Sequence, residues 1–80
     1  MPEAAWRRSL VSIAGQLRER AALASEAASA LEQEEREETA AANRSRAEHL
    51  RTRADTYREA ARLLDDAEAM IASLQDTRDD

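Results

Sequence analysis

The densest group of potential metal ligands in the sequence is an acidic run over residues 34–38, where four of the five residues are glutamate. Di-iron helical bundles combine such carboxylates with a Glu-x-x-His motif. The single histidine, His49, has Arg46 three residues before it, so this motif is missing, and there is no cysteine to supply a thiolate. We therefore expect a solvated acidic surface, with no metal and no other cofactor.

Ser45 and His49 stand four residues apart, a spacing that places a hydroxyl and an imidazole on one face of a helix. A nucleophilic serine also needs a third group that orients the imidazole and backbone donors that stabilise an oxyanion. No third group of this kind is evident, and the chain has one glycine, too few for a Gly-rich turn. The sequence predicts no enzyme and no catalytic residue.

Arginines recur at intervals of seven in the second half of the chain, at Arg44, Arg51 and Arg58. Such a ridge could follow the phosphates of a nucleic acid. Acidic residues, among them Glu48 and Asp55, are interleaved with it at helix-pair spacing, which favours ion pairing within the protein. A net charge of −5 also disfavours generic binding to nucleic acid, so this reading is kept as an alternative only.

Length and composition restrict the fold that presents these groups. Eighty residues suffice for one small domain, residues 1–80, and alanine supplies 19 of the 34 hydrophobic residues. The 12 basic residues are all arginine, which indicates a high-GC bacterial or phage genome. Ala, Glu, Arg and Leu, which dominate the chain, all favour helix.

The sequence predicts no membrane segment and no signal peptide, so we expect a cytoplasmic protein. The segment from Trp6 to Arg20 is amphipathic and could lie on an anionic membrane. Its apolar side is the one that the helix-packing seam requires, so we expect no membrane binding.

Two long helices are expected, with a break near the middle of the chain. Asn43 can take the left-handed conformation that ends helices, and Ser45–Glu48 match a capping box for a second helix. The predicted elements are a helix over about 3–40, a turn over about 40–45, a second helix over about 45–76, and a frayed acidic tail over 77–80.

Large apolar residues step by three and four in both halves, as in a coiled coil. The predicted seam consists of Trp6, Leu10, Ile13, Leu17, Leu31, Leu50, Tyr57, Leu64, Ile71 and Leu74. Folding about residues 40–41 pairs Leu31 with Leu50 and Leu10 with Ile71. The fold class is therefore all-α, an antiparallel two-helix hairpin, although an antiparallel dimer of continuous helices satisfies the same pairing.

Further apolar residues are expected to lie off this seam, among them Ala21, Ala28, Leu23, Leu63 and Met70. A second apolar stripe of this kind predicts that two hairpins dimerise into a four-helix bundle. Gly15 either allows close approach there or is simply tolerated within the helix.

The predicted function is that of a non-enzymatic interaction module, a self-associating hairpin that presents a charged helical surface to a protein partner. That surface is predicted to consist of Glu34, Glu35, Glu38, Arg44, Arg51, Arg53 and Arg58. The alternative is a small acidic phage-type inhibitor, an anti-defence protein or nucleic-acid mimic that blocks a nucleic-acid-binding protein. The second alternative is nucleic-acid binding through the arginine ridge.

Overall fold

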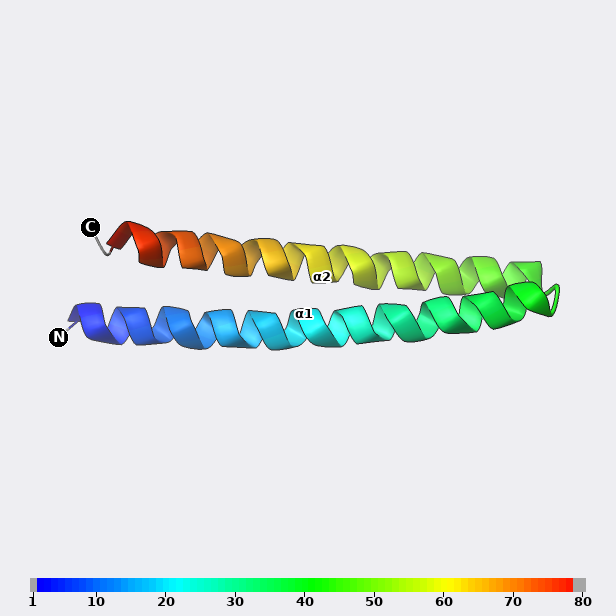
Figure 1. Cartoon of the computed structure of the whole chain (residues 1–80), viewed down its shortest axis with the longest axis horizontal. Coiled ribbons are helices and arrows are strands. Elements are labelled where there is room, and N and C mark those ends of the chain that lie inside the picture. The colour runs from blue at the N-terminus through cyan, green and yellow to red at the C-terminus, as the bar shows by residue number, and fades with distance from the viewer. Residues whose placement is uncertain (1, 79–80) are drawn as a thin grey trace.

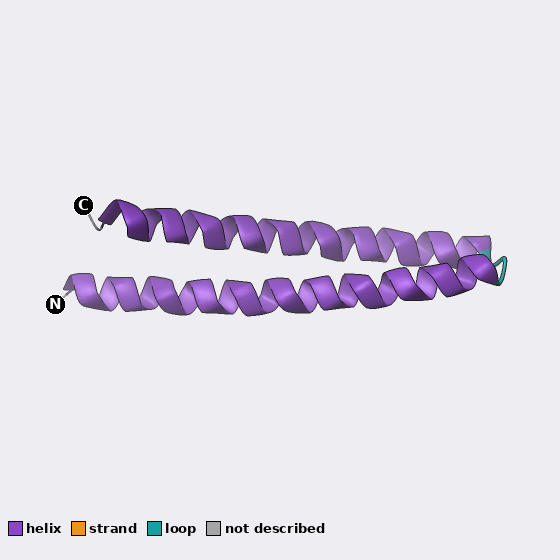
Figure 2. Ribbon diagram, viewed as in Figure 1, coloured by secondary structure: helices purple, strands orange, loops and turns teal. Residues whose placement is uncertain are grey.

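A computed structural model describes the backbone of residues 2–78 and the side chains of residues 5–75. Two helices, α1 (Pro2–Ala40) and α2 (Arg44–Arg78), lie side by side in opposite directions, so both ends of the chain are at the same end of the rod (Figures 1 and 2). The rod measures 61 × 16 × 12 Å. The prediction of an all-α antiparallel hairpin is confirmed, and the pairing is made within one chain.

The turn between the helices occupies three residues, 41–43, and ends α1 with a Schellman motif. The backbone N–H of Asn43 donates to the carbonyl of Glu38 (2.8 Å), and the N–H of Ala42 donates to the carbonyl of Thr39 (3.0 Å). Ala42 has a φ of 63°, so it is this alanine, and not Asn43, that takes the left-handed conformation. The expectation for Asn43 is wrong because the chain turns one residue earlier.

Asn43 instead begins α2. Its carbonyl accepts the N–H of Ala47 (3.0 Å), and its side-chain Oδ1 accepts the N–H of Arg46 (3.4 Å), which is the bonding pattern of an N-cap residue. Ser45 consequently lies inside the first turn of α2, which begins at Arg44. The signal for a helix start was therefore real, but the capping residue is two positions before the predicted one.

The buried core of the described residues is small and rich in alanine. It consists of Ala21, Ala24, Ala28, Leu31, Ala47, Leu50, Ala54 and Ala61. Leu31, Leu50 and Ala54 form one cluster, in which a leucine of α1 packs against two residues of α2 that are one helical turn apart. Because the chain turns about Ala42, α2 is displaced along α1 relative to the pairing expected for a turn at 40–41.

The inner row of α1 also differs from the predicted seam. Burial follows residues 10, 14, 17, 21, 24, 28 and 31, which alternate in steps of four and three. Ala21 and Ala28, which the sequence analysis places off the seam, are buried, whereas Ile13 is 45% exposed. The inner row thus keeps Leu10, Leu17 and Leu31 of the predicted seam and takes Ala14 in place of Ile13.

The ends of the two helices lie within two residues of the predicted ones. Helix α2 continues to Arg78, two residues beyond the predicted helix end, and residues 79–80 of the predicted acidic tail lie outside the described residues. Over the part of the chain that the structure describes, neither helix has a stretch long and apolar enough to cross a bilayer.

Candidate functional site: a polar edge and an apolar face

Arg58 makes the most extensive contact between the two helices. Its Nε and Nη2 donate to the two carboxylate oxygens of Glu32 (3.2 and 2.7 Å), its Nη1 donates to Ser25 Oγ (3.0 Å), and its Nη2 also donates to Ser29 Oγ (3.1 Å). One planar guanidinium from α2 therefore binds three side chains of α1, including a bidentate carboxylate. Such a contact fixes how the helices are aligned along the rod.

Hydrogen bonding between these two groups stabilises both charged forms. The bond from Arg58 lowers the pKa of the Glu32 carboxyl below its usual value of 4.5, and the bond to Glu32 raises the pKa of Arg58. The pair is open to solvent, so its effect on affinity for a partner depends on how much water that partner would exclude.

The arginine ridge was not predicted to bind Ser25, Ser29 and Glu32. The three residues are spaced by four and three, so they share one side of α1. Two small hydroxyl residues next to a glutamate at this spacing, opposite arginines repeated every seven residues, are the signal that could have revealed the contact.

The contacts of Arg58 define what we call the polar edge of the hairpin. On α2 it contains Arg44, Arg51 and Arg58, and on α1 it contains Val11, Arg18, Ser25 and Glu32, each set at intervals of seven residues. Arg18 Nη2 on this edge also binds Glu68 Oε1 of α2 at 2.7 Å. Two interhelical arginine–carboxylate pairs therefore hold the same edge, one nearer the turn and one nearer the termini.

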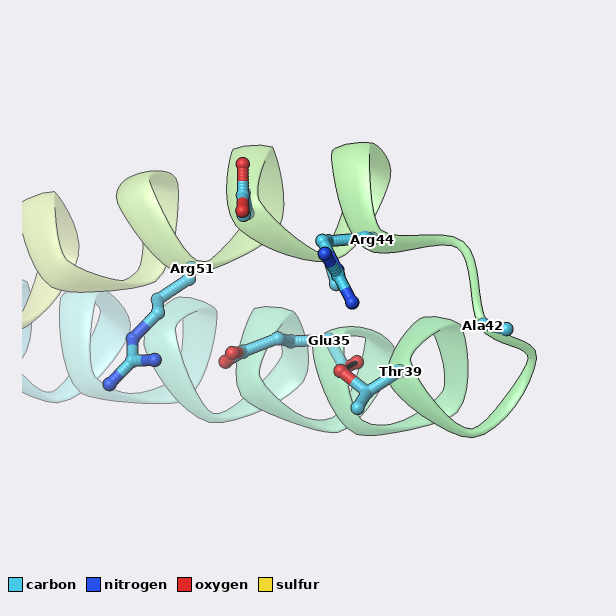
Figure 3. Close-up of a pocket in the computed structure, with 7 residues that line it drawn as sticks. Glu35, Thr39, Ala42, Arg44 and Arg51 are labelled. Atoms are coloured by element: carbon cyan, nitrogen blue, oxygen red, sulfur yellow. Dashed lines mark hydrogen bonds between the residues drawn. The ribbon is translucent and has the colours of Figure 1, made fainter.

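A hollow opens on the polar edge beside the turn. It is lined by Glu35, Thr39, Ala42, Arg44, Ala47, Glu48 and Arg51. Figure 3 shows that Glu35 and Thr39 come from α1, while Arg44 and Arg51 come from α2, with Glu35 between the two arginines along the rod. Both signs of charge are present within one small depression, which suits a partner with complementary charges.

The predicted partner surface is only partly brought together. Glu35, Arg44, Arg51 and Arg58 lie along the polar edge, as the hollow and the Arg58 contacts require. Glu38 is half-buried and forms an ion pair with Arg46, with Oε1 of Glu38 3.5 Å from Nε of Arg46.

Glu34 and Arg53 are separated from this set. The helical period carries them to the opposite edge of the hairpin, away from the hollow. The predicted surface therefore divides into two, of which the larger part is on the polar edge.

Arg62 continues the basic character of α2 but turns back on its own helix. It binds Glu59, which lowers the pKa of that carboxyl and raises the pKa of Arg62, and its Nη1 binds Asp66 Oδ2 at 3.1 Å. Arg58 binds Glu32 in the same way, so both Arg58 and Arg62 have carboxylate partners within the protein.

The side of the hairpin opposite the polar edge is apolar in its outer half, and we call it the apolar face. On α2 it follows Ala60, Leu63, Ala67, Met70 and Leu74 in steps of three and four, and on α1 it includes Ile13 and Leu23. Leu63 is 54% exposed and Met70 is 67% exposed. Large apolar side chains are therefore arranged as a second coiled-coil stripe that this hairpin does not cover.

The remaining seam residues differ in how far the second helix covers them. Leu31 and Leu50 are buried, while those that are half-buried are Leu10, Leu17, Leu64 and Ile71. Those that remain exposed in addition to Ile13 are Trp6, Tyr57 and Leu74. Two helices alone cover the seam fully only near the turn.

The other candidates from the sequence lie apart from these surfaces. Ser45 and His49 are both exposed in the first two turns of α2. Within the described residues, no three His, Asp or Glu side chains are grouped so that they could hold a metal ion.

Comparison with known proteins gives no family for this chain: no family model matches it, and neither a curated protein nor a solved structure matches it. The polar edge and the apolar face of the hairpin are therefore the features that bear on its function.

Proposed function

We propose that this protein is a non-enzymatic interaction module that dimerises through the apolar face and recognises a protein partner with the polar edge. The observation that carries the proposal is the exposed apolar stripe on α2, formed by Leu63, Met70 and Leu74. Contiguous exposed apolar surface on a soluble domain marks a site of association. A second hairpin would cover it with the packing that four-helix bundles use.

The polar edge supports the recognition part of the proposal. Charged groups at an interface contribute to partner choice and association rate more than to affinity. The hollow beside the turn holds Glu35, Arg44 and Arg51 within one depression, and Arg58 is held by three side chains of α1. A surface whose charges are already positioned loses less conformational freedom when a partner binds.

Light scattering combined with sedimentation over a wide concentration range tests the dimer. Leu63→Glu should weaken it on the order of a hundredfold, because a charge would be placed in an apolar interface. Val11→Glu is the matched control, because Val11 is 60% exposed but lies on the polar edge. A stable monomer at micromolar concentration, or equal weakening by both variants, would reject the apolar face as the interface.

Affinity capture followed by mass spectrometry tests the recognition part, with wild type compared with Arg51→Glu. Capture that requires Arg51 and survives Leu63→Glu supports a partner on the polar edge. Capture of a nucleic-acid-binding protein that is lost steeply as salt rises would instead favour the acidic inhibitor. A gel shift on duplex and single-stranded DNA and RNA that requires Arg51 would favour nucleic-acid binding.

A further inference from the structure

We infer that the two hairpins of the proposed dimer lie parallel, with both turns at the same end and a two-fold axis along the rod. This inference depends on the proposed self-association and adds its orientation. A two-fold axis that brings one apolar face onto another must lie between them, either along the rod or across it. The first choice stacks α1 on α2 of the second copy, and the second choice stacks each helix on its own equivalent.

The distribution of apolar residues along this face distinguishes the two choices. The large apolar side chains of α2 on the face begin at Leu63 and continue toward the termini through Met70 and Leu74. Nearer the turn the same side of α2 carries Arg46 and Arg53. On α2 the face is therefore apolar in its outer half and charged in the half next to the turn, whereas α1 carries one arginine in its outer half, Arg20, seven residues after Ile13.

A parallel arrangement brings like halves together. The outer apolar half of one copy then covers the outer apolar half of the other. A flush antiparallel arrangement would place Arg53 of one copy near Met70 of the other, and Arg46 near Leu74. Burying the Arg53 guanidinium against apolar side chains is costly, so the antiparallel arrangement loses both the apolar contact and the solvation of Arg53.

Charge complementarity near the turn favours the same choice. On this side α1 carries Glu34 and Glu37, whereas α2 carries Arg46 and Arg53 at corresponding distances from the turn. Stacking α1 on α2 of the second copy puts acidic residues opposite basic ones in both halves of the symmetric interface. Stacking each helix on its own equivalent pairs none of these charges.

The occupant of the apolar face is accordingly a second copy of this chain in one defined orientation. Both the apolar and the charged halves of the face are self-complementary only when the turns coincide. An interface with this property closes on itself as a dimer, because the same surface is used by both copies.

A single spin label measures the orientation directly. The chain has no cysteine, so Ala40→Cys, an exposed residue at the end of α1, gives one labelling site near the turn. Any distance measured between labels in a singly labelled protein is then between copies. With adjacent helices about 8–10 Å apart, the parallel dimer places the two labels about 20–35 Å apart.

The outcomes are distinct for the inference and for the proposed function. An antiparallel dimer separates the labels by roughly the 61 Å length of the rod, and that result would overturn the parallel orientation while leaving self-association intact. A monomeric mass by light scattering with no distance between copies would overturn both. A short distance that is lost in Leu63→Glu but kept in Val11→Glu would confirm that the parallel dimer uses the apolar face.

Discussion

The half of the hairpin next to the turn and the half that carries the termini use the same heptad pattern with different results. Every buried side chain among the described residues lies between positions 21 and 61. Outside that range the seam contains leucine and isoleucine, yet these residues are half-buried or exposed. We call residues 21–61 the turn half. The described residues on either side of that range are the open half.

The comparison shows that this hairpin is closed by alanines together with two leucines, Leu31 and Leu50. Alanines at positions 24, 28, 54 and 61 fill the turn half, and alanine lets two helix backbones approach closely. Larger side chains in the open half extend past the partner helix and remain partly exposed. A two-helix hairpin therefore completes its own core in one half and leaves a surface for association in the other.

The largest difference between the halves should come from leucine truncation. Leu50 is 1% exposed, so Leu50→Ala should lower the free energy of unfolding by about 3 kcal/mol, through lost burial and a residual cavity. Leu64 in the open half is half-buried, and Leu64→Ala should cost roughly half as much in dilute protein. Urea unfolding monitored by circular dichroism gives the free energy of unfolding of both variants. Equal losses in the two variants would contradict the division into halves.

Enlarging an alanine tests how tightly the turn half is packed. Ala28 is fully buried, so Ala28→Leu should force the helices apart and cost about 2 kcal/mol. Ala30→Leu, two residues away on the exposed surface, should change stability by less than about 0.5 kcal/mol. If Ala28→Leu were neutral, the alanines would not be what sets the distance between the helices.

The turn itself offers a gain in stability of about 1 kcal/mol. Ala42 has a φ of 63°, a conformation that glycine adopts without the steric cost of a Cβ. Ala42→Gly should therefore raise the free energy of unfolding, while Ala41→Gly, next to it, should not. A loss of stability in Ala42→Gly would show that the left-handed alanine does not strain the turn.

In the open half the corresponding gain comes from Gly15. A Cβ built on this residue meets nothing within 4 Å, so glycine is not needed there for close approach within the hairpin. Gly15→Ala should stabilise α1 by about 0.5–1 kcal/mol, because alanine loses less backbone entropy in a helix. Amide hydrogen exchange should therefore show less fraying of α1 in the open half and unchanged protection in the turn half.

Acid should weaken the turn half through Glu32, with the smallest effect of those considered. Because the folded-state pKa of Glu32 is lowered below 4.5, its stabilising contribution is complete above that pH and is lost as the pH falls through the lowered value. Glu32→Gln should therefore be less stable than wild type near pH 7, and the difference should vanish near pH 2. Thermal unfolding at several pH values measures it.

Glu59→Gln provides the control for this pH dependence. The pKa of Glu59 is also lowered, but its partner Arg62 lies on the same helix. Both variants should show the same sign, and only Glu32→Gln should also loosen the contact between the helices. A constant deficit of Glu32→Gln at every pH would show that its carboxylate charge is not what stabilises the contact.

Several features could be predicted from the sequence because they depend on local pattern. Steps of three and four predicted two packed helices, and the polar stretch between Leu31 and Leu50 predicted a break near the middle. The interleaving of arginines with acidic residues predicted ion pairs, although the partner suggested for Arg58 by spacing, Asp55, is replaced by Glu32 and two serines of α1. The residues that close the turn were each misplaced by one or two positions, since several small polar residues there match the same capping patterns.

The sequence by itself determined that this chain is helical and that its two halves pack in opposite directions. These properties follow from helix propensity, heptad spacing and residue type, which are local. Only the tertiary structure decided that Ala21 and Ala28 face inward on α1 while Ile13 does not, because a row of alanines and a neighbouring row of larger residues have the same period. On α2 the packing left Leu74, which was expected on the seam, exposed beside Leu63 and Met70, which were expected off it.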